Sequence, residues 1–178
     1  MKYFQLLIEI LTVYKNSRKT GRVECHNNDE FEYSMRLIKR FDLKYISYVK
    51  KSKDNKKIIY IYFSKNEKIV QKLYYYHHDP TASLVHDFRD LNEIIGKLYK
   101  YPTCCINIFI NNQKEVIQDN DNAILLKTLH NSKSKIFNIC MNRFSKYTPI
   151  FHLPHSFDCK KSIKIGKNNL RPQEIHGL

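Results

Sequence analysis

Apolar side chains recur at helical spacing in several stretches of the chain. These stretches are residues 2–15, the segment that follows the capping pair Asn28-Asp29, residues 66–76, residues 80–100 and residues 122–130. The strongest pattern is 80–100, where Leu84, Phe88, Leu91, Ile95 and Leu98 step by four and three. It opens with Asp79-Pro80, a favoured helix start, and Pro102 disfavours helical geometry beyond Lys100. We expect this helix to form the core, with Phe88 and Leu91 nearly fully buried.

Two stretches instead alternate in the manner of strands. Leu43–Lys50 and Lys57–Ser64 are rich in Ile, Tyr and Val, and the turn-forming Ser52–Asn55 separates them. They predict a β-hairpin over about 43–64. The segment 106–110 is apolar and fits either a short helix or a strand, the type of 136–144 stays open, and Cys25 and His26 fall in a polar loop.

This order of elements predicts a mainly helical α+β single domain. The pattern shows neither an internal repeat nor a linker. Within that domain, residues 1–76 form a basic helical and hairpin part, and residues 77–165 hold the central helix and most of the Cys and His residues. Residues 166–178 form a basic tail.

Composition narrows the class of protein. A chain of 178 residues with 42% hydrophobic residues has enough apolar surface for a folded core. No run of about 18 apolar residues is present, so no segment is expected to span a membrane. The apolar start up to Val13 contains Glu9 and is followed by no small-residue cleavage site, which favours a mature helix over a signal peptide. The expected location is the cytoplasm.

The formal charge of +14 is unevenly distributed. Residues 36–72 carry twelve basic and three acidic residues, and residues 127–171 carry ten basic residues and one acidic residue. Residues 77–126, between these flanks, carry four basic and seven acidic residues. The layout suggests that the flanks contact phosphate-rich partners, although runs of charge also occur as solvated surface.

The predicted hairpin interleaves lysines with tyrosines, which suits nucleic acid because lysines pair with phosphates and tyrosines stack on bases. Its candidate nucleic-acid-binding residues are Lys50, Lys51, Lys53, Lys56, Lys57, Tyr48 and Tyr60. Packing of the tyrosines across the two strands explains the same pattern structurally and is the favoured interpretation of those side chains.

Cysteine and histidine gather in two proline-framed segments. Tyr101-Pro102-Thr103-Cys104-Cys105 ends the strongest helix, and His152 to Cys159 lies fifty residues later. Five cysteines at this spacing do not resemble a secreted disulfide framework, so metal or thiol chemistry is the more natural interpretation. The candidate ligands are Cys104, Cys105, His155 and Cys159, with His152 and Cys140 as alternates. Zinc is the first expectation and an iron–sulfur cluster the second; a redox thiol pair and ordinary buried cysteines stay open.

These two segments also resemble a known family. Tyr-Pro-x-Cys-Cys, followed by His-x-Pro-x-Ser-x-x-Cys and a further serine, is similar to the archaeal domain-of-unknown-function family 483. The matching residues are Tyr101, Pro102, Cys104, Cys105, His152, Pro154, Ser156, Cys159 and Ser162. The resemblance extends over about residues 30–165 and implies an archaeal origin and a functional site, but no reaction.

The chain departs from the family pattern at two positions. Lys100 stands where the pattern has glycine before Tyr-Pro, and His155 stands where it has cysteine after the second proline. The second departure replaces a thiolate with an imidazole, which favours zinc over an all-cysteine iron–sulfur cluster.

A further motif pairs histidine with aspartate. His77-His78-Asp79 and His86-Asp87, with Asp90 and Glu93 downstream, suggest an HD-like metallophosphohydrolase, although the gap between the pairs is shorter than that family uses. Helix capping by Asp79 accounts for part of this motif. Three hypotheses therefore stand: a Cys/His metal or thiol protein, a basic nucleic-acid-binding module with structural cysteines, and, least favoured, the phosphohydrolase.

Overall fold

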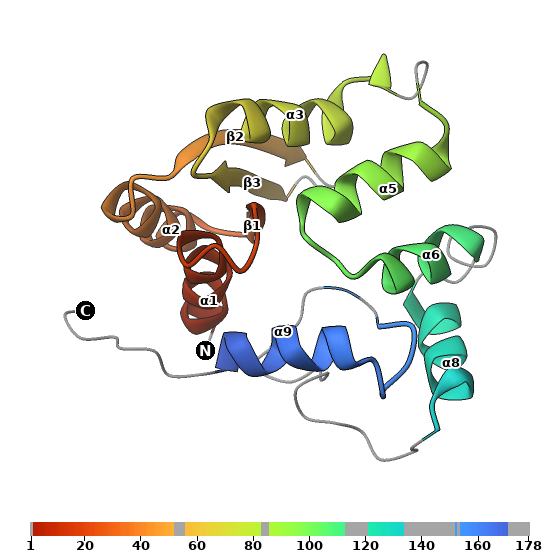
Figure 1. Ribbon diagram of the computed structural model, residues 1–178. Helices are drawn as coiled ribbons and strands as arrows, with labels where there is room; N and C mark the ends of the chain where they lie inside the picture. The colour runs from red at the N-terminus through yellow and green to blue at the C-terminus, as the bar shows by residue number, and fades with distance from the viewer. Residues whose placement is uncertain are drawn as a thin grey trace. The chain divides into compact units, whose positions relative to one another are not determined.

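The computed structural model describes residues 2–51, 56–82, 86–112, 121–133, 152 and 154–170. These residues form a mainly helical α+β protein with one small antiparallel sheet (Figure 1). The chain divides into two compact units, Met1–Lys100 and Tyr101–Leu178. That division falls 24 residues later than the boundary after residue 76 that the composition suggested, because the central helix belongs with the first unit.

Unit 1 begins with an α–β–α segment and continues through a hairpin into two more helices. Its elements are α1 (Lys2–Tyr14), β1 (Thr20–Cys25), α2 (Asn28–Arg40), β2 (Lys44–Lys51), β3 (Lys57–Ser64), α3 (Glu67–His78) and α5 (Phe88–Leu98). The predicted first helix, second helix and hairpin are confirmed. Only β1 was not foreseen.

The strand order is β1-β3-β2, and β3 pairs with both neighbours in antiparallel register. Cys25 therefore lies at the end of a strand, so the prediction of a polar loop there was wrong. The short segment Thr20–Cys25 alternates buried and half-buried positions, but its glycine and two charged residues mask the strand pattern in the sequence.

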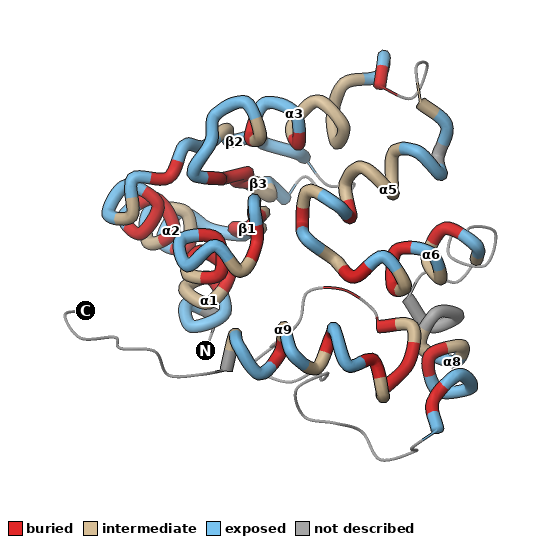
Figure 2. The backbone as a smooth tube through the Cα atoms, in the orientation of Figure 1, coloured by how far each residue is buried: buried red, intermediate tan, exposed pale blue. Residues whose placement is uncertain are grey.

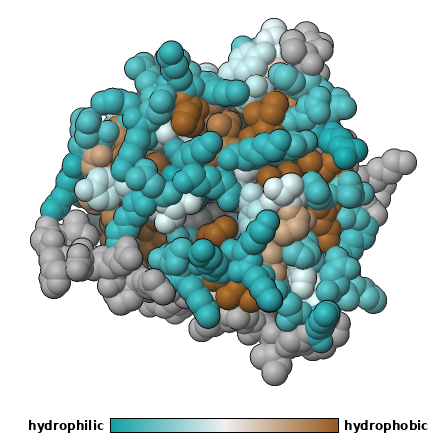
Figure 3. Space-filling view, in the orientation of Figure 1, coloured by the Kyte–Doolittle hydropathy of each residue, from teal (hydrophilic) through white to brown (hydrophobic). Residues whose placement is uncertain are grey.

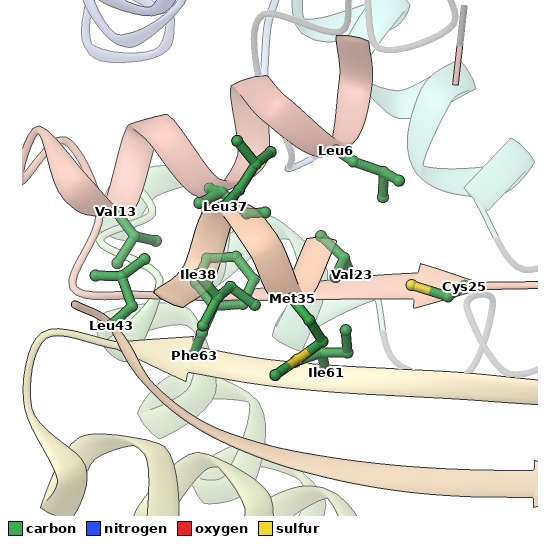
Figure 4. Close-up of a cluster of buried hydrophobic side chains, with 11 residues drawn as sticks. Leu6, Val13, Val23, Cys25, Met35, Leu37, Ile38, Leu43, Ile61 and Phe63 are labelled. Atoms are coloured by element: carbon green, nitrogen blue, oxygen red, sulfur yellow. The ribbon is translucent and has the colours of Figure 1, made fainter. Parts of the chain in front are cut away.

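The core of unit 1 lies between α1, α2 and one face of the sheet. Figure 4 shows side chains of α1 and α2 pointing toward β1 and β3. The buried members are Leu6, Ile10, Val13, Val23, Cys25, Met35, Leu37, Ile38, Leu43, Ile61 and Phe63. Burial of this apolar surface is the main source of the unit's stability.

Gly21 allows β1 to approach Phe63 closely. A Cβ atom at this position would lie 2.5 Å from Cζ of Phe63 and 3.1 Å from Cγ2 of Val13. Both of those side chains are fully buried and have no free space to move into. Any side chain larger than hydrogen would therefore push the strand away from its neighbour.

The other face of the sheet is covered by α3. Val70 and Leu73 are buried there, and the hydroxyl of Tyr62 lies 2.7 Å from Nε2 of His78. The ring of Tyr48 packs against that same His78, with 4.1 Å between ring centroids. This arrangement agrees with the interpretation that hairpin tyrosines serve packing.

The central helix begins later than the sequence predicted. Asp79 closes α3, and its carboxylate accepts hydrogen bonds from the backbone and hydroxyl of Thr81. Asp87 caps α5 instead, accepting a bond from the backbone N–H of Asp90 at 2.8 Å. Two Asp residues at suitable positions compete as caps, and hydrophobic spacing alone does not choose between them.

The prediction that Leu91 of this helix is nearly fully buried in the core was wrong. Leu91 is half-buried, whereas the fully buried apolar side chains come mainly from α1, α2, α3 and the sheet. The side chain of Phe88 lies outside the described residues. Helix α5 contacts α3, and none of its described side chains belongs to the main core, so an apolar stripe does not identify a central element here.

Unit 2 contains α6 (Thr103–Asn111), α8 (Asp121–Asn131) and α9 (Lys160–Leu170). The segment 106–110, for which the sequence allowed a helix or a strand, is helical. The helix expected at 122–130 is confirmed. The basic tail was expected from residue 166, but α9 continues to Leu170. Ile163 and Ile165 of that helix pack against the cysteines. The apolar segment 136–144 lies outside the described residues.

No helix within the described ranges has both the length and the apolar character needed to cross a membrane. Across the face drawn in Figure 3, hydrophilic side chains surround smaller apolar areas.

Candidate metal centre

Cys104 and Cys105 lie in the first turn of α6. Pro102 precedes that helix in an extended conformation, with φ −58° and ψ 133°, and its carbonyl accepts the backbone N–H groups of Cys105 and Ile106. Proline fits this position because its fixed φ is pre-organised and no N–H is lost to the helix. The thiols are therefore held by helical backbone, and not by a loop after a helix as the sequence suggested.

The second ligand segment is the turn that leads into α9. The backbone N–H of Cys159 donates to the carbonyl of Ser156, and the carbonyl of Cys159 accepts the N–H of Ile163. Cys159 thus sits at the N-terminal end of α9, fixed on both sides. Figure 2 shows buried residues both at the start of α6 and in the segment before α9.

Helix α8 supports this turn through its polar side chains. The hydroxyl of Thr128 donates to the carbonyl of Pro154, and the hydroxyl of Ser132 accepts the backbone N–H of Phe157 at 2.8 Å. Asn131 donates to the carbonyl of His155 at 3.3 Å. The backbone of the ligand segment is therefore tied at three points to α8 and to Ser132, the residue that follows it, which fixes where its side chains project.

Four of the predicted site residues converge. One ligand atom from each of Cys104, Cys105, His155 and Cys159 lies within 4.8 Å of the others. The sulfur atoms of Cys104 and Cys105 are each 3.9 Å from Sγ of Cys159. Nδ1 of His155 is 3.6 Å from Sγ of Cys105, so the imidazole turns toward the thiols. The expected shared site is confirmed as a geometric arrangement.

Burial and hydrogen bonding shift the pKa values of the three thiols in different directions. The pKa of Cys159 lies below the ordinary thiol value, chiefly because Cys105 donates a hydrogen bond to it, with Ser162 and the charge of His155 adding to the effect. The pKa of Cys105 is raised, first because its proton is used in that bond and second because it is buried. Burial also raises the pKa of Cys104. The arrangement favours a thiolate at Cys159, which accepts hydrogen bonds from Cys105 and Ser162.

His152, one of the two alternate ligands, lies outside this group of four residues. Its Nε2 is 2.8 Å from Oγ of Ser162, and the ring of Tyr101 packs on it at 4.9 Å between centroids. The other alternate, Cys140, lies outside the described residues. Cys25 is in unit 1, where its sulfur contacts the hydroxyl of Ser34 at 3.7 Å.

The histidine–aspartate motif does not assemble. In the part of the chain that the structure describes, Cys104, Cys105, His155 and Cys159 form the only group of three or more potential metal ligands. His78 bonds Tyr62, and Asp79 and Asp87 serve as caps. This arrangement does not support the phosphohydrolase hypothesis.

The candidate nucleic-acid-binding residues lie on and around the hairpin. Lys50, Lys51, Lys56 and Lys57 are exposed, and Tyr48 and Tyr60 are half-buried partners across the strands. Lys53 lies outside the described residues.

Two parts of the site were not foreseen from the sequence. The role of α8 was missed because the helical pattern does not say which polar side chain faces a loop distant in sequence. Ser162 was noted only as a match to the family pattern, yet its hydroxyl contacts two of the thiols. The signal was present in its spacing, because a residue three positions after Cys159 on a helix lies on the same face.

Comparison with known proteins gives one match. The family model described as "Protein of unknown function (DUF483)" matches residues 68–175, which include every residue of the cysteine–histidine group. Neither a curated protein nor a solved structure matches the chain.

Proposed function

The chain belongs to the DUF483 family of proteins of unknown function, and from the geometry of its site we propose that it binds one zinc ion through Cys104, Cys105, His155 and Cys159. The ion would join the start of α6 to the turn before α9. In this proposal the metal is structural, and it stabilises unit 2 in the way that zinc stabilises small metal-binding domains.

The separation of the ligand atoms carries the proposal. Tetrahedral zinc with bonds of about 2.3 Å to sulfur holds two sulfur atoms roughly 3.8 Å apart. Two sulfur pairs in the group are separated by 3.9 Å, and the sulfur–nitrogen pair by 3.6 Å. Side chains packed only for their apolar character have no reason to bring four soft ligand atoms to this spacing.

The ligand set favours a closed site. Three thiols and one imidazole complete a tetrahedron, which leaves no position for water or substrate. Cys105 and Cys159 are 3% and 4% exposed, so most of the shell is shielded from solvent. This combination is typical of structural zinc and not of hydrolytic zinc.

The alternatives fit less well. A polynuclear iron–sulfur cluster spreads its thiolates around several atoms, whereas these sulfur atoms already have the spacing for one ion. A dithiol redox pair would not require an imidazole, yet His155 points at Cys105. Imidazole mixed with thiolate is a ligand set common for zinc.

Metal analysis of the purified full-length chain tests the proposal. We expect one zinc per chain, retained through gel filtration and released by a strong chelator. The Cys159→Ser variant should lose it, because the sulfur of Cys159 lies 3.9 Å from the sulfur of each of the other two cysteines. Cys25→Ala is the matched control, since it removes a buried thiol from unit 1 and should keep the full zinc content.

Absence of stoichiometric zinc in wild type, even after reconstitution under reducing conditions, would overturn the proposal. If mass spectrometry then showed that a mild oxidant removes two hydrogen atoms, two protons and two electrons, from the chain, two of the thiols would instead form a redox pair.

A second candidate function is weak nucleic-acid binding by the hairpin. It is supported by the exposed Lys50, Lys51 and Lys57, none of which has a carboxylate partner among the described residues. Lysines without a carboxylate partner can bind phosphates, and this binding releases counterions from a nucleic-acid backbone. Because the ring of Tyr48 packs against His78, Tyr60 is the candidate for stacking on bases.

Salt-dependent binding to single-stranded nucleic acid tests this candidate. Replacing Lys50, Lys51, Lys56 and Lys57 by Gln should flatten the slope of log affinity against log salt by about 3, at roughly 0.7 per phosphate contact. Replacing the four exposed lysines of α9, which are Lys160, Lys161, Lys164 and Lys167, removes the same charge elsewhere. Equal effects from both sets would reduce the interaction to net charge and contradict a hairpin interface.

A further inference from the structure

Two buried polar residues line the cysteine–histidine group without belonging to it. Ser162 is 0% exposed and His152 is 6% exposed. Oγ of Ser162 lies 3.3 Å from Sγ of Cys159 and 3.4 Å from Sγ of Cys105, and 2.8 Å from Nε2 of His152. A buried hydroxyl in contact with two sulfur atoms and an imidazole calls for a specific arrangement of protons.

The inventory of donors sets the direction of these hydrogen bonds. A serine hydroxyl has a single proton, and a thiolate sulfur can only accept. When the cysteines are thiolates, as metal binding requires, the Ser162 proton must point toward a sulfur. The oxygen of Ser162 is then the acceptor, so Nε2 of His152 carries the proton and donates it. The chain of bonds therefore runs from imidazole N–H to hydroxyl to thiolate.

The net charge of the metal centre explains why such a chain of hydrogen bonds is needed. A divalent ion with three thiolates and a neutral imidazole leaves one net negative charge in a mostly buried site. A buried charge without a hydrogen-bond donor is costly, and a charge-assisted bond offsets part of that cost. Among the described residues, Ser162 is the hydroxyl that contacts the sulfur atoms of the group.

We propose that Ser162, oriented by His152, is a positioning residue of this centre that donates its hydroxyl proton to the Cys159 thiolate and thereby sets the affinity for the metal. This inference rests on the proposed function. It assigns His152, an alternate ligand by sequence, to the outer layer of the site. Tyr101, whose ring packs on that imidazole, fixes its orientation.

Zinc affinity of full-length variants, measured by competition with a chelator, tests the proposal. Ser162→Ala should bind zinc about 10–100-fold more weakly than wild type, the usual range for loss of an outer hydrogen-bond partner. His152→Phe should weaken binding to a similar extent, because it keeps the ring packing and removes the donor. His152→Gln places an amide N–H near the original Nε2 and should recover most of the affinity.

The double variant separates a connected chain from two unrelated packing defects. If the two residues act through one hydrogen-bond chain, Ser162→Ala with His152→Phe should be little weaker than the weaker single variant. Cobalt-substituted protein supplies an independent signal, because loss of a hydrogen bond to sulfur shifts the sulfur-to-cobalt charge-transfer band. Thr103→Ala, which removes an exposed hydroxyl beside Cys104, is the control and should leave both measurements unchanged.

Three results would overturn the inference while leaving zinc binding intact. These are wild-type affinity in Ser162→Ala, equal weakness of the Gln and Phe variants at His152, and additive losses in the double variant. A wild-type chain that binds no zinc would instead sink the proposed function itself, and this inference with it.

Discussion

Individual residues decide where the chain can come close to itself. Gly21 is the clearest case, because the space that a Cβ would need is filled by the ring of Phe63. The sequence did not reveal this role. Steric demands of that kind depend on which strand lies opposite, and pairing of β1 with β3 joins residues more than thirty positions apart.

We expect Gly21→Ala to lower the free energy of unfolding of unit 1 by about 1–3 kcal/mol, as overpacking of a filled core usually does. Urea denaturation followed by circular dichroism measures this. Phe63→Leu removes the opposing atoms, so the double variant should be less destabilised than the sum of the two single changes. Strictly additive losses would show that the ring of Phe63 is not the obstacle.

Lys100 has a strained backbone conformation. Its φ is 56°, a left-handed conformation that glycine adopts without cost and lysine does not. Lys100 follows Tyr99, the C-cap of α5, and precedes Tyr101-Pro102, a position after a helix cap where glycine often takes the left-handed conformation. The backbone conformation at this position therefore favours glycine over lysine.

Lys100→Gly should therefore stabilise the protein by about 0.5–1 kcal/mol, after the entropic cost of glycine and the loss of the bond from Nζ to the carbonyl of Asn16. Thermal unfolding measures the change. Lys100→Ala is the matched control, since it removes the same bond but retains Cβ, and it should give no gain. A gain in both variants would trace the effect to the lysine side chain instead of to φ.

At the scale of elements, the sequence predicted helices and the hairpin well because hydrophobic period is a local property. It failed at β1, which is short and carries two charges, and at the start of α5, where Asp79 and Asp87 were both plausible caps. The four ligand candidates were found because their residue types are uncommon and sit beside prolines. Their support by α8 depends on tertiary contact and left no such signal.

Helix α3 makes unit 1 sensitive to acid. Burial lowers the pKa of His77 to about 4, and the nearby charges of Arg22 and His78 act in the same direction. The unfolded chain takes up this proton near pH 6.5 and the folded chain only near pH 4, so stability falls as pH drops through that window. The loss attributable to His77 should reach about 3 kcal/mol.

Urea unfolding of wild type and His77→Gln, at several pH values between about 7 and 4.5, isolates this contribution. The difference between the two proteins should shrink or reverse in favour of the glutamine variant as pH falls. A constant difference across the range would mean that His77 is not kept neutral by the fold.

For the whole molecule, the two units carry their stabilising features separately. The main apolar core draws only on residues of unit 1, and the proposed metal ligands draw only on residues of unit 2. Neither composition nor turn signals mark the boundary at Lys100, so two units were not expected there.

Metal removal should accordingly act on one unit. With a chelator present, hydrogen exchange should accelerate in α6, the start of α9 and the turn before it, because their ordering depends on the ion. The sheet, α1 and α2 should keep their protection. Uniform acceleration along the chain would show that the stability of unit 1 also depends on the metal.

The central position of β3 has a consequence for how the chain is made. Synthesis delivers β1 and β2 first, yet among the described residues each of them pairs only with β3, the third strand of the sheet to appear. Until residue 64 has left the ribosome, two strands therefore carry unpaired backbone groups, and such edges readily pair with other chains. The hairpin then closes within about 1–10 μs, whereas β1 must find its partner across a much longer loop. The nascent chain is therefore most prone to aggregate until β3 has emerged and paired with both neighbours, which is the interval in which a chaperone would protect it.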